Sequence, residues 1–196
     1  ARDEATAVRI GSEINEHNHE RKNIDRRTTQ EALEMVHSGN CLSSGNATIV
    51  YNPEWHKGVV GIVASRLVEA FYKPTIVFTK SQEGLITGSA RSVHGFDLYD
   101  AIESCADLLE NFGGHLYAAG LTLKEENIPA FCERIEKAIS GTIIPAMQTP
   151  VVDIDAKLNF SQITPKFLRI LKQFQPFGPG NSAPVFLTEN VYDNGM

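Results

Sequence analysis

The sequence predicts an α/β fold in which helices flank a central sheet, with a long helix before this domain and the start of a further domain after it. Short apolar runs rich in β-branched residues alternate with segments of about ten to fifteen residues whose apolar positions recur at helical spacing. A highly polar stretch precedes this alternation, and a segment rich in Thr, Pro and small residues follows it near residues 141–150.

The N-terminal region predicts one long helix. Residues 3–36 contain no proline and are mostly polar. Their thin apolar stripe has near-heptad spacing and consists of Ile10, Ile14, Ile24 and Met35. Because such a helix buries little surface by itself, it is expected either to bridge two domains or to lie as a solvated surface helix. Ser38-Gly39 is expected to end it.

The central domain is predicted to alternate strands and helices. A helix with apolar positions from Val60 to Phe71 ends before Pro74, and Asp97 is expected to cap a second helix whose buried face runs from Leu98 to Leu109. A further helix has its apolar face within residues 128–139. Strands are expected over residues 47–51, 75–79, 85–92 and 121–124. Beyond the linker, the expected elements are a strand over 151–158, a helix over 165–174 and a strand over 184–187, which are too few for a closed domain.

The composition is that of an ordinary globular chain of 196 residues, with 42% hydrophobic and 21% charged residues. A prior of roughly 150 residues per domain predicts one full domain and part of another. No apolar run approaches the roughly 18 residues of a spanning helix, and no signal-peptide pattern opens the chain. The expectation is therefore a cytoplasmic protein that does not bind a membrane.

Charge and cysteine content restrict the kind of site. The 18 Lys and Arg residues stand against 24 Asp and Glu, a formal charge of −6, which disfavours a protein that coats nucleic acid through a broad basic surface. A polyanion would have to be bound locally. Cys41, Cys105 and Cys132 are odd in number and far apart, so neither a disulfide framework nor a zinc pair is expected.

Ser89 and Arg91 are candidates for phosphate binding. They lie two apart on a predicted strand, so their side chains share one face of the sheet. A guanidinium fork and a hydroxyl together suit a phosphate. The alternative is an arginine that pairs with a carboxylate at the sheet edge.

Gly113, Gly114 and His115 form a second candidate. Consecutive glycines can turn successive N–H groups inward as an anion nest, beside which His115 could donate to a phosphate or approach a metal held elsewhere. The alternative is a simple tight turn. His56, with Lys57, lies at the start of a predicted helix, where unpaired N–H groups favour anions, although glycines there also serve helix packing.

The sequence contains none of the motifs of a self-contained active site. It lacks HExxH, a Walker loop, GxSxG and a DxD-type carboxylate cluster. No metal site is therefore expected within it, and His115 is its one possible catalytic contributor.

Four motifs in succession resemble those of RecJ exonucleases of the DHH phosphoesterase superfamily. They are WHKGVVGIVASRL, GSARS followed by GFDLYDAI, FGGHLYAAG, and PFGPGN followed by PVF. The resemblance implies an interdomain linker helix over residues 1–40, a DHH-associated substrate-binding domain over 41–147, and the N-terminal part of an OB-like domain over 148–196. It also implies that this sequence is a piece of a longer enzyme.

The resemblance implies an exonuclease that degrades single-stranded DNA from its 5′ end in recombination and repair. Mn²⁺ or Mg²⁺ would be bound by a domain outside this sequence, and DNA repair proteins would be possible partners. Carried over by position, Ser89 and Arg91 would hold a DNA phosphate, Gly113, Gly114 and His115 would contact the phosphate near the metals, and His56 would line the same cleft.

Two other functions remain open on the sequence alone. One is a DHH-family phosphodiesterase acting on short oligonucleotides or cyclic dinucleotides, which shares a Gly-Gly-His segment but usually ends after the associated domain. The other is a non-catalytic nucleic-acid-binding module, against which the long linker helix and the GSARS segment argue.

Overall fold

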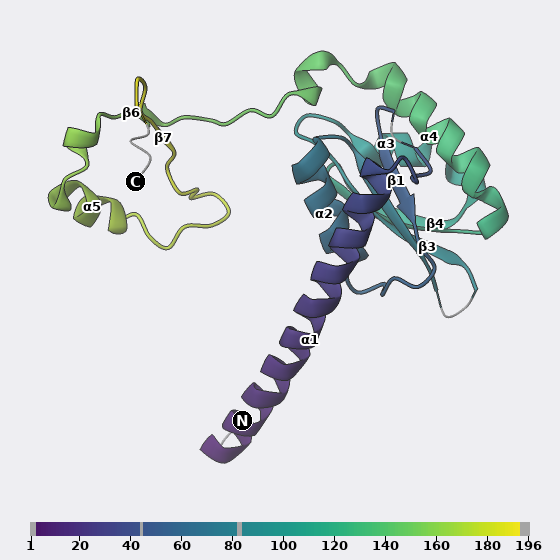
Figure 1. Cartoon of the computed structure of the whole chain (residues 1–196), viewed down its shortest axis with the longest axis horizontal. Coiled ribbons are helices and arrows are strands. Elements are labelled where there is room, and N and C mark those ends of the chain that lie inside the picture. The colour runs from purple at the N-terminus through teal and green to yellow at the C-terminus, as the bar shows by residue number, and fades with distance from the viewer. Residues whose placement is uncertain (1–2, 44, 82–83, 193–196) are drawn as a thin grey trace. The chain divides into compact units, whose positions relative to one another are not determined.

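The computed structural model describes residues 3–43, 45–81 and 84–192, arranged as two compact units, Ala1–Pro150 and Val151–Met196. Figure 1 shows the first unit as a long helix followed by a sheet with helices on both faces. The first two residues of the expected linker helix, and the last four of the expected OB-like segment, lie outside the described residues.

The first helix, α1, spans Glu4–His37. It begins at Asp3, whose side chain accepts a hydrogen bond from the backbone N–H of Thr6. It ends just before Gly39, whose φ of +75° breaks the helix. The second half of α1 packs on the domain through a face that includes Ala32, whereas Ile14, in the first half, is 54% exposed. The apolar stripe is therefore used only in its second half.

The central sheet has five strands: β1 (Thr48–Tyr51), β2 (Thr75–Lys80), β3 (Ile86–Arg91), β4 (Leu109–His115) and β5 (Ala118–Leu123). Their order is β1-β2-β3-β5-β4. Strands β1 and β2 are parallel, and every other pair is antiparallel. The helix α2 (Val60–Phe71) provides the crossover that a parallel pair requires.

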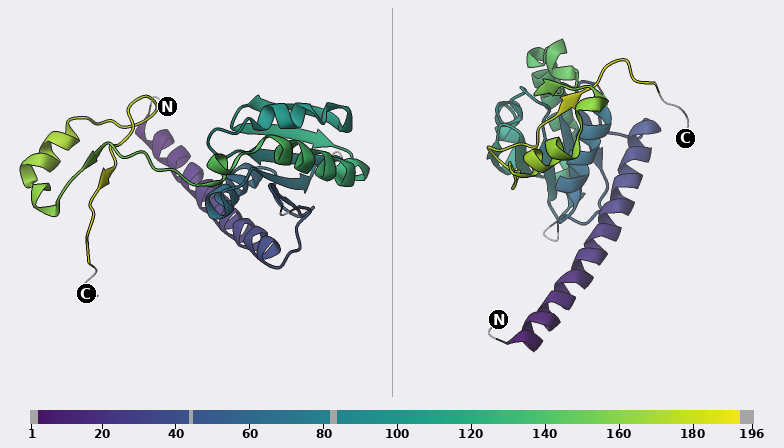
Figure 2. Two further views of the ribbon diagram at one scale, coloured as in Figure 1. Left: turned by 90° about the horizontal axis from the view of Figure 1, so that it is seen from above. Right: turned by 90° about the vertical axis from the view of Figure 1, so that its left-hand side faces the viewer.

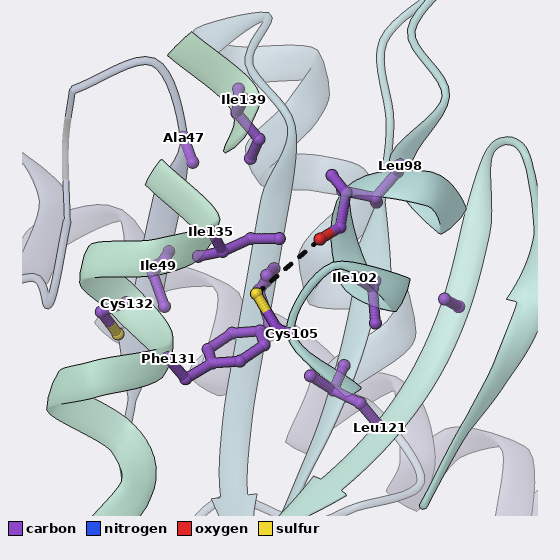
Figure 3. Packing of buried hydrophobic residues seen from close by; sticks show 14 of the residues in the cluster. Ala47, Ile49, Leu98, Ile102, Cys105, Leu121, Phe131, Cys132, Ile135 and Ile139 are labelled. Atoms are coloured by element: carbon purple, nitrogen blue, oxygen red, sulfur yellow. Dashed lines mark hydrogen bonds between the residues drawn. The ribbon is translucent and has the colours of Figure 1, made fainter. Parts of the chain in front are cut away.

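Two apolar clusters lie on opposite faces of the sheet. Helices α3 (Leu98–Glu103) and α4 (Ile128–Thr142) cover one face, where Phe78 of β2 meets Phe131 of α4 with ring centroids 5.8 Å apart. Figure 3 shows this cluster, which also contains Cys105 and Cys132. The other face packs against α2 and the second half of α1. Viewed from above, the helices lie on both sides of the sheet (Figure 2). The predicted α/β class is confirmed.

The helix expected from Leu98 to Leu109 is shorter than predicted. Helix α3 ends at Glu103, a 3₁₀ turn spans Ala106–Leu108, and Leu109 begins β4. Leu109 pairs with Leu123 of β5. Leu109 is therefore a half-buried strand residue packed against the core, which no helical periodicity within the segment could reveal.

The second unit contains two short strands, β6 (Ala156–Lys157) and β7 (Phe186–Leu187), which pair in parallel, and the helix α5 (Pro165–Lys172). Thr164 caps α5 by accepting a hydrogen bond from the backbone N–H of Phe167. The ring centroids of Phe167 and Phe186 lie 5.5 Å apart. The strand expected over 151–158 is thus only two residues long, because β7 pairs with it over two residues alone. Further 3₁₀ turns span Glu125–Asn127, Pro145–Gln148 and Phe160–Gln162.

Within the described residues, the structure contains no helix with both the length and the apolar character needed to cross a membrane.

Candidate functional site

A cavity of about 750 Å³ lies between α2 and β3. Its α2 side includes Gly61 and Arg66, and its β3 side includes Ser89 and Arg91. The remaining lining residues are Lys57, Gly58, Val60, Ile62, Ser65, Glu69, Thr87 and Gly88. The cavity opens on the face of the sheet opposite to α3 and α4.

Ser89 and Arg91 share this face, as their spacing predicts. Arg91 Nη1 donates to Ser89 Oγ at 3.1 Å and to the carbonyl oxygen of Ala90 at 2.8 Å. Within the described part of the chain, Arg91 forms no salt bridge with a carboxylate. The described residues therefore do not form the ion pair at the sheet edge that was the alternative for Arg91.

Gly61 keeps the space beside these two side chains clear. A Cβ atom placed on Gly61 would lie 3.0 Å from both Arg91 Nη2 and Ser89 Oγ. That separation is shorter than ordinary van der Waals contact, so a larger residue would press on the hydroxyl and the guanidinium. Gly61, the second glycine of the motif WHKGVVGIVASRL, thus preserves access to Ser89 and Arg91.

His115 lies on the same face of the sheet as Arg91. Arg91 is directly opposite Ala118 of β5, and Ala118 is directly opposite His115 of β4. Residues directly opposite one another on antiparallel strands point to the same face. Two strand spacings separate Arg91 from His115, roughly 10 Å between backbones. The fold therefore brings together two segments that lie 24 positions apart in the sequence.

The anion nest expected at Gly113 and Gly114 is not formed. Both residues lie within strand β4, and neither has a positive φ. A Cβ atom on Gly114 would lie 2.3 Å from the carbonyl oxygen of Ala118 and 2.5 Å from Ala119 Cα. Gly114 is required because the two strands approach closely, and the turn itself falls at Leu116 and Tyr117.

A row of small residues crosses the open part of this face. Ser89 is opposite Gly120, and Gly120 is opposite Gly113. Both glycines are exposed, with no other atom within 4 Å of where a Cβ would lie. Because α2 packs on β2 and β3, the surface of β5 and β4 is left open beside the cavity. A flat, accessible strip therefore extends from Ser89 toward His115.

The two histidines of the candidate set differ in their surroundings. His115 is exposed, and its Nδ1 accepts weakly from the N–H of Tyr117 at 3.4 Å. His56 is also exposed, and its Nδ1 accepts from the N–H of Gly58 at 3.0 Å. His56 does not line the cavity, although its neighbours Lys57 and Gly58 do. The helix start that the sequence indicated thus faces the cavity through Lys57 and Gly58.

The charges at the cavity oppose the overall charge of the chain. Its cationic lining residues are Lys57, Arg66 and Arg91, and Glu69 is its anionic one. The chain as a whole carries a formal charge of −6. A cavity with this lining concentrates anions locally without a basic surface. Such local binding is what the negative net charge of the sequence led us to expect.

Arg66, Glu69 and Ser65 are cavity residues that the sequence analysis missed. They occupy the side of α2 away from its apolar positions, where any surface helix carries polar residues. The available signal was helical spacing, since Ser65 lies four residues after Gly61, and Glu69 lies four after Ser65 and three after Arg66. Spacing alone does not separate such residues from solvated ones.

The described residues contain no group of three or more His, Cys, Asp or Glu side chains placed to hold a metal ion. His115 has no such companions among them. The side chains that we describe therefore do not fit a divalent metal, and they instead supply donors for anionic oxygens.

The sequence-family model of the DHHA1 domain matches residues 44–141, which is half of the chain. The chain belongs to the DHHA1 family. In this DHHA1 domain the matched residues contain the whole five-stranded sheet and the cavity. The model of the RecJ OB domain matches residues 154–195 of the second unit. A DHHA1 domain followed by an OB domain gives the chain a RecJ-like fold, as the four motifs suggested.

Curated relatives of this DHHA1 protein include the single-stranded-DNA-specific exonuclease RecJ of Bacillus subtilis, 37% identical over 190 residues. The alignment covers 96% of this chain but 24% of that relative. The enzyme of the same name from Escherichia coli is 34% identical, with 90% of this chain and 32% of the relative aligned. The chain thus spans about a quarter to a third of the length of these relatives.

Solved structures agree with this assignment. The crystal structure of RecJ in complex with Mn²⁺ from Thermus thermophilus matches with a TM-score of 0.82 at 30% identity, covering 96% of this chain and 27% of that one. The Mg²⁺ complex from the same organism gives 0.80 at 29% identity, with 95% and 28% covered.

Proposed function

We propose that this chain is the substrate-binding part of a single-stranded-DNA-specific exonuclease that hydrolyses phosphodiester bonds from the 5′ end. The main support is that Ser89, Arg91 and His115 lie on one open face of the DHHA1 sheet, beside a cavity with cationic side chains. The DHHA1 and RecJ OB matches also support this function.

In this proposal, the residues of the chain bind and orient the DNA. The guanidinium of Arg91 and the hydroxyl of Ser89 hold a phosphate by charge-assisted hydrogen bonds. The glycine row, Gly113 and Gly120, lets the sugar-phosphate backbone lie close to the sheet, and His115 donates to an oxygen near the bond that is cut. Lys57 attracts the strand toward the cavity.

Divalent metal ions would supply the hydrolytic chemistry by activating a water and stabilising the leaving oxygen. Neighbouring RecJ structures contain Mn²⁺ or Mg²⁺. Because the described residues hold no suitable ligand cluster, we place the metal ligands in a region corresponding to the part of those relatives that this chain does not cover. The DHHA1 domain would then form the opposite wall of the cleft.

A phosphodiesterase for short oligonucleotides or cyclic dinucleotides is the weaker candidate. The RecJ OB match over residues 154–195 favours the exonuclease, because a second nucleic-acid-binding unit suits a long strand. The same RecJ OB match also disfavours a non-catalytic nucleic-acid-binding module. We further propose a cytoplasmic role in DNA recombination and repair, in contact with other repair proteins.

Arg91→Ala tests the proposal directly. The substitution removes a charge-assisted hydrogen bond to phosphate, so we expect affinity for a 5′-phosphorylated single-stranded oligothymidylate to fall by about 1.5 to 3 kcal/mol. Fluorescence anisotropy with a labelled oligonucleotide measures the effect. Arg134→Ala is the matched control, since Arg134 lies on α4, across the sheet, where it pairs with Asp107.

The Arg134→Ala variant should bind the oligonucleotide like the unmodified chain. Equal affinity of the Arg91→Ala variant and the unmodified chain would reject the phosphate role of Arg91. A wild-type chain with no preference for single-stranded over double-stranded DNA would reject the single-strand specificity.

A further inference from the structure

Arg66 is a second arginine in the same cavity, held in place by the first helix. Its Nη2 donates to Asp25 Oδ2 at 2.9 Å, although the two residues lie 41 positions apart. The Asp25 side chain is only 8% exposed, and its other oxygen accepts from Thr29 Oγ1 at 3.2 Å. Asp25 is therefore a buried carboxylate of α1 whose described cationic partner is Arg66.

The Arg66 side chain retains donors for a ligand. A guanidinium carries five N–H groups, and the bond to Asp25 uses one of its nitrogens. The side chain is 50% exposed and lines the cavity together with its neighbour Ser65. Asp25 thus fixes the orientation of the guanidinium without removing it from the cavity.

The cavity is too large for a single phosphate. Its volume is about 750 Å³, and Arg91 and Ser89 line the part beside Gly61. Arg66 lies five residues after Gly61 on α2, a rise of roughly 7.5 Å along the helix axis. Arg66 and the Ser89–Arg91 pair therefore line different parts of one cavity, which leaves room for two phosphates.

We propose that Arg66 binds the second phosphate of the DNA strand whose first phosphate is held by Ser89 and Arg91, and that Asp25 is its positioning residue. The docking of α1 on α2 then sets the spacing between the two phosphate sites. This inference rests on the proposed function and adds a second phosphate subsite to it.

Glu69 limits how far the strand can follow α2. It lines the cavity one helical turn beyond Ser65. A third phosphate at that point would meet a carboxylate, so the strand leaves the cavity after the second phosphate.

The test compares two ligands, thymidine 5′-monophosphate and 5′-phosphorylated dithymidylate, which carry one and two phosphates. Binding to the isotopically labelled full chain is followed by NMR titration, which measures weak affinities. Because Arg66→Ala would leave Asp25 buried without its partner, the test variant is Asp25→Asn with Arg66→Gln, which retains a neutral hydrogen-bonding pair.

In this double variant, affinity for the dinucleotide should fall about tenfold or more, the loss of one charge-assisted hydrogen bond. Affinity for the mononucleotide should not change. The slope of log affinity against log salt for the dinucleotide should become shallower by about 0.7, the value for one phosphate contact on a single strand. Arg27→Gln is the control, because Arg27 is exposed on α1 and does not line the cavity.

Asp25→Asn alone should produce a smaller loss for the dinucleotide, because Arg66 keeps its charge but loses its anchor. Wild-type dinucleotide affinity in Asp25→Asn would overturn the positioning role. Equal losses for both ligands in the double variant would overturn the second subsite.

If Arg91→Ala weakens both ligands and the double variant weakens neither, the subsite fails while the proposed function stands. If Arg91→Ala changes neither ligand, the proposed function itself fails.

Discussion

Gly114 and Gly113 are neighbours in β4 with opposite surroundings. A Cβ atom on Gly114 would lie 2.3 Å from a backbone oxygen of β5, whereas one on Gly113 would meet nothing within 4 Å. We expect Gly114→Ala to lower the free energy of unfolding by about 1 to 3 kcal/mol, as for overpacking. Gly113→Ala should change it by less than about 0.5 kcal/mol. Urea denaturation followed by circular dichroism measures both, and equal effects would contradict the packing argument.

Cys132 and Cys105 are buried thiols with suppressed ionisation. Burial, with Glu136 nearby, raises the pKa of Cys132 to about 11, and burial also raises the pKa of Cys105. The unfolded chain has a thiol pKa near 8.5, so it loses these protons first as pH rises. For Cys132, the stability that the neutral thiol contributes is complete below about pH 8.5 and is lost as pH rises toward about 11.

At pH 8, we therefore expect iodoacetamide to alkylate only Cys41, the half-buried thiol, in the folded protein. Cys105 and Cys132 should react only after denaturant is added, because the thiolate is the reactive form. Mass spectrometry of the labelled peptides gives the order in which the three thiols react. Rapid labelling of all three thiols would show that the core is open, and Cys41→Ser should remove the fast reaction.

Glu136 joins the helix α4 to the loop that leads into the strand β1. Its carboxylate accepts from Ser43 Oγ at 2.7 Å and from the backbone N–H groups of Asn46 and Ala47 at 2.5 and 3.2 Å. Ala47 is fully buried, so its N–H group has no access to water as a substitute. This one side chain fixes the start of the sheet against the helix.

Glu136→Ala should lower the free energy of unfolding by about 1.5 to 3 kcal/mol, because it leaves buried donors without an acceptor. Glu133→Ala is the matched control, since Glu133 is exposed on the same helix and should alter stability by less than about 0.5 kcal/mol. Thermal unfolding of the three proteins compares them. A stable Glu136→Ala variant would mean that the loop finds other acceptors.

The chain as a whole is expected to bind DNA without cleaving it. The chain spans about a quarter to a third of the length of its exonuclease relatives, and its described residues include no cluster of metal ligands. We therefore expect the purified chain to bind single-stranded DNA but not to degrade it in Mn²⁺. A gel assay with a 5′-labelled oligonucleotide checks this. Turnover that persists in highly purified chain and disappears in Arg91→Ala would contradict the assignment of hydrolysis to another region.

The sequence predicted most elements because their signals are local. The helical spacing of Val60, Val63 and Leu67 identifies α2, and Asp97 marks the start of α3. The spacing of Ser89 and Arg91 placed both side chains on one face. The helix expected to reach Leu109 and the nest expected at Gly113 and Gly114 were wrong, because Leu109 and both glycines belong to β4, a strand whose partner, β5, lies later in the sequence.

The α/β class, the candidate residues for phosphate binding and the family motifs follow from the sequence alone, since composition, periodicity and spacing are properties of short stretches. That Arg91 and His115 share a face, and that Arg66 of the same cavity donates a hydrogen bond to Asp25, became visible only in the tertiary structure. These relations depend on strand order and helix docking, which arise from pairing and burial between segments far apart in the chain.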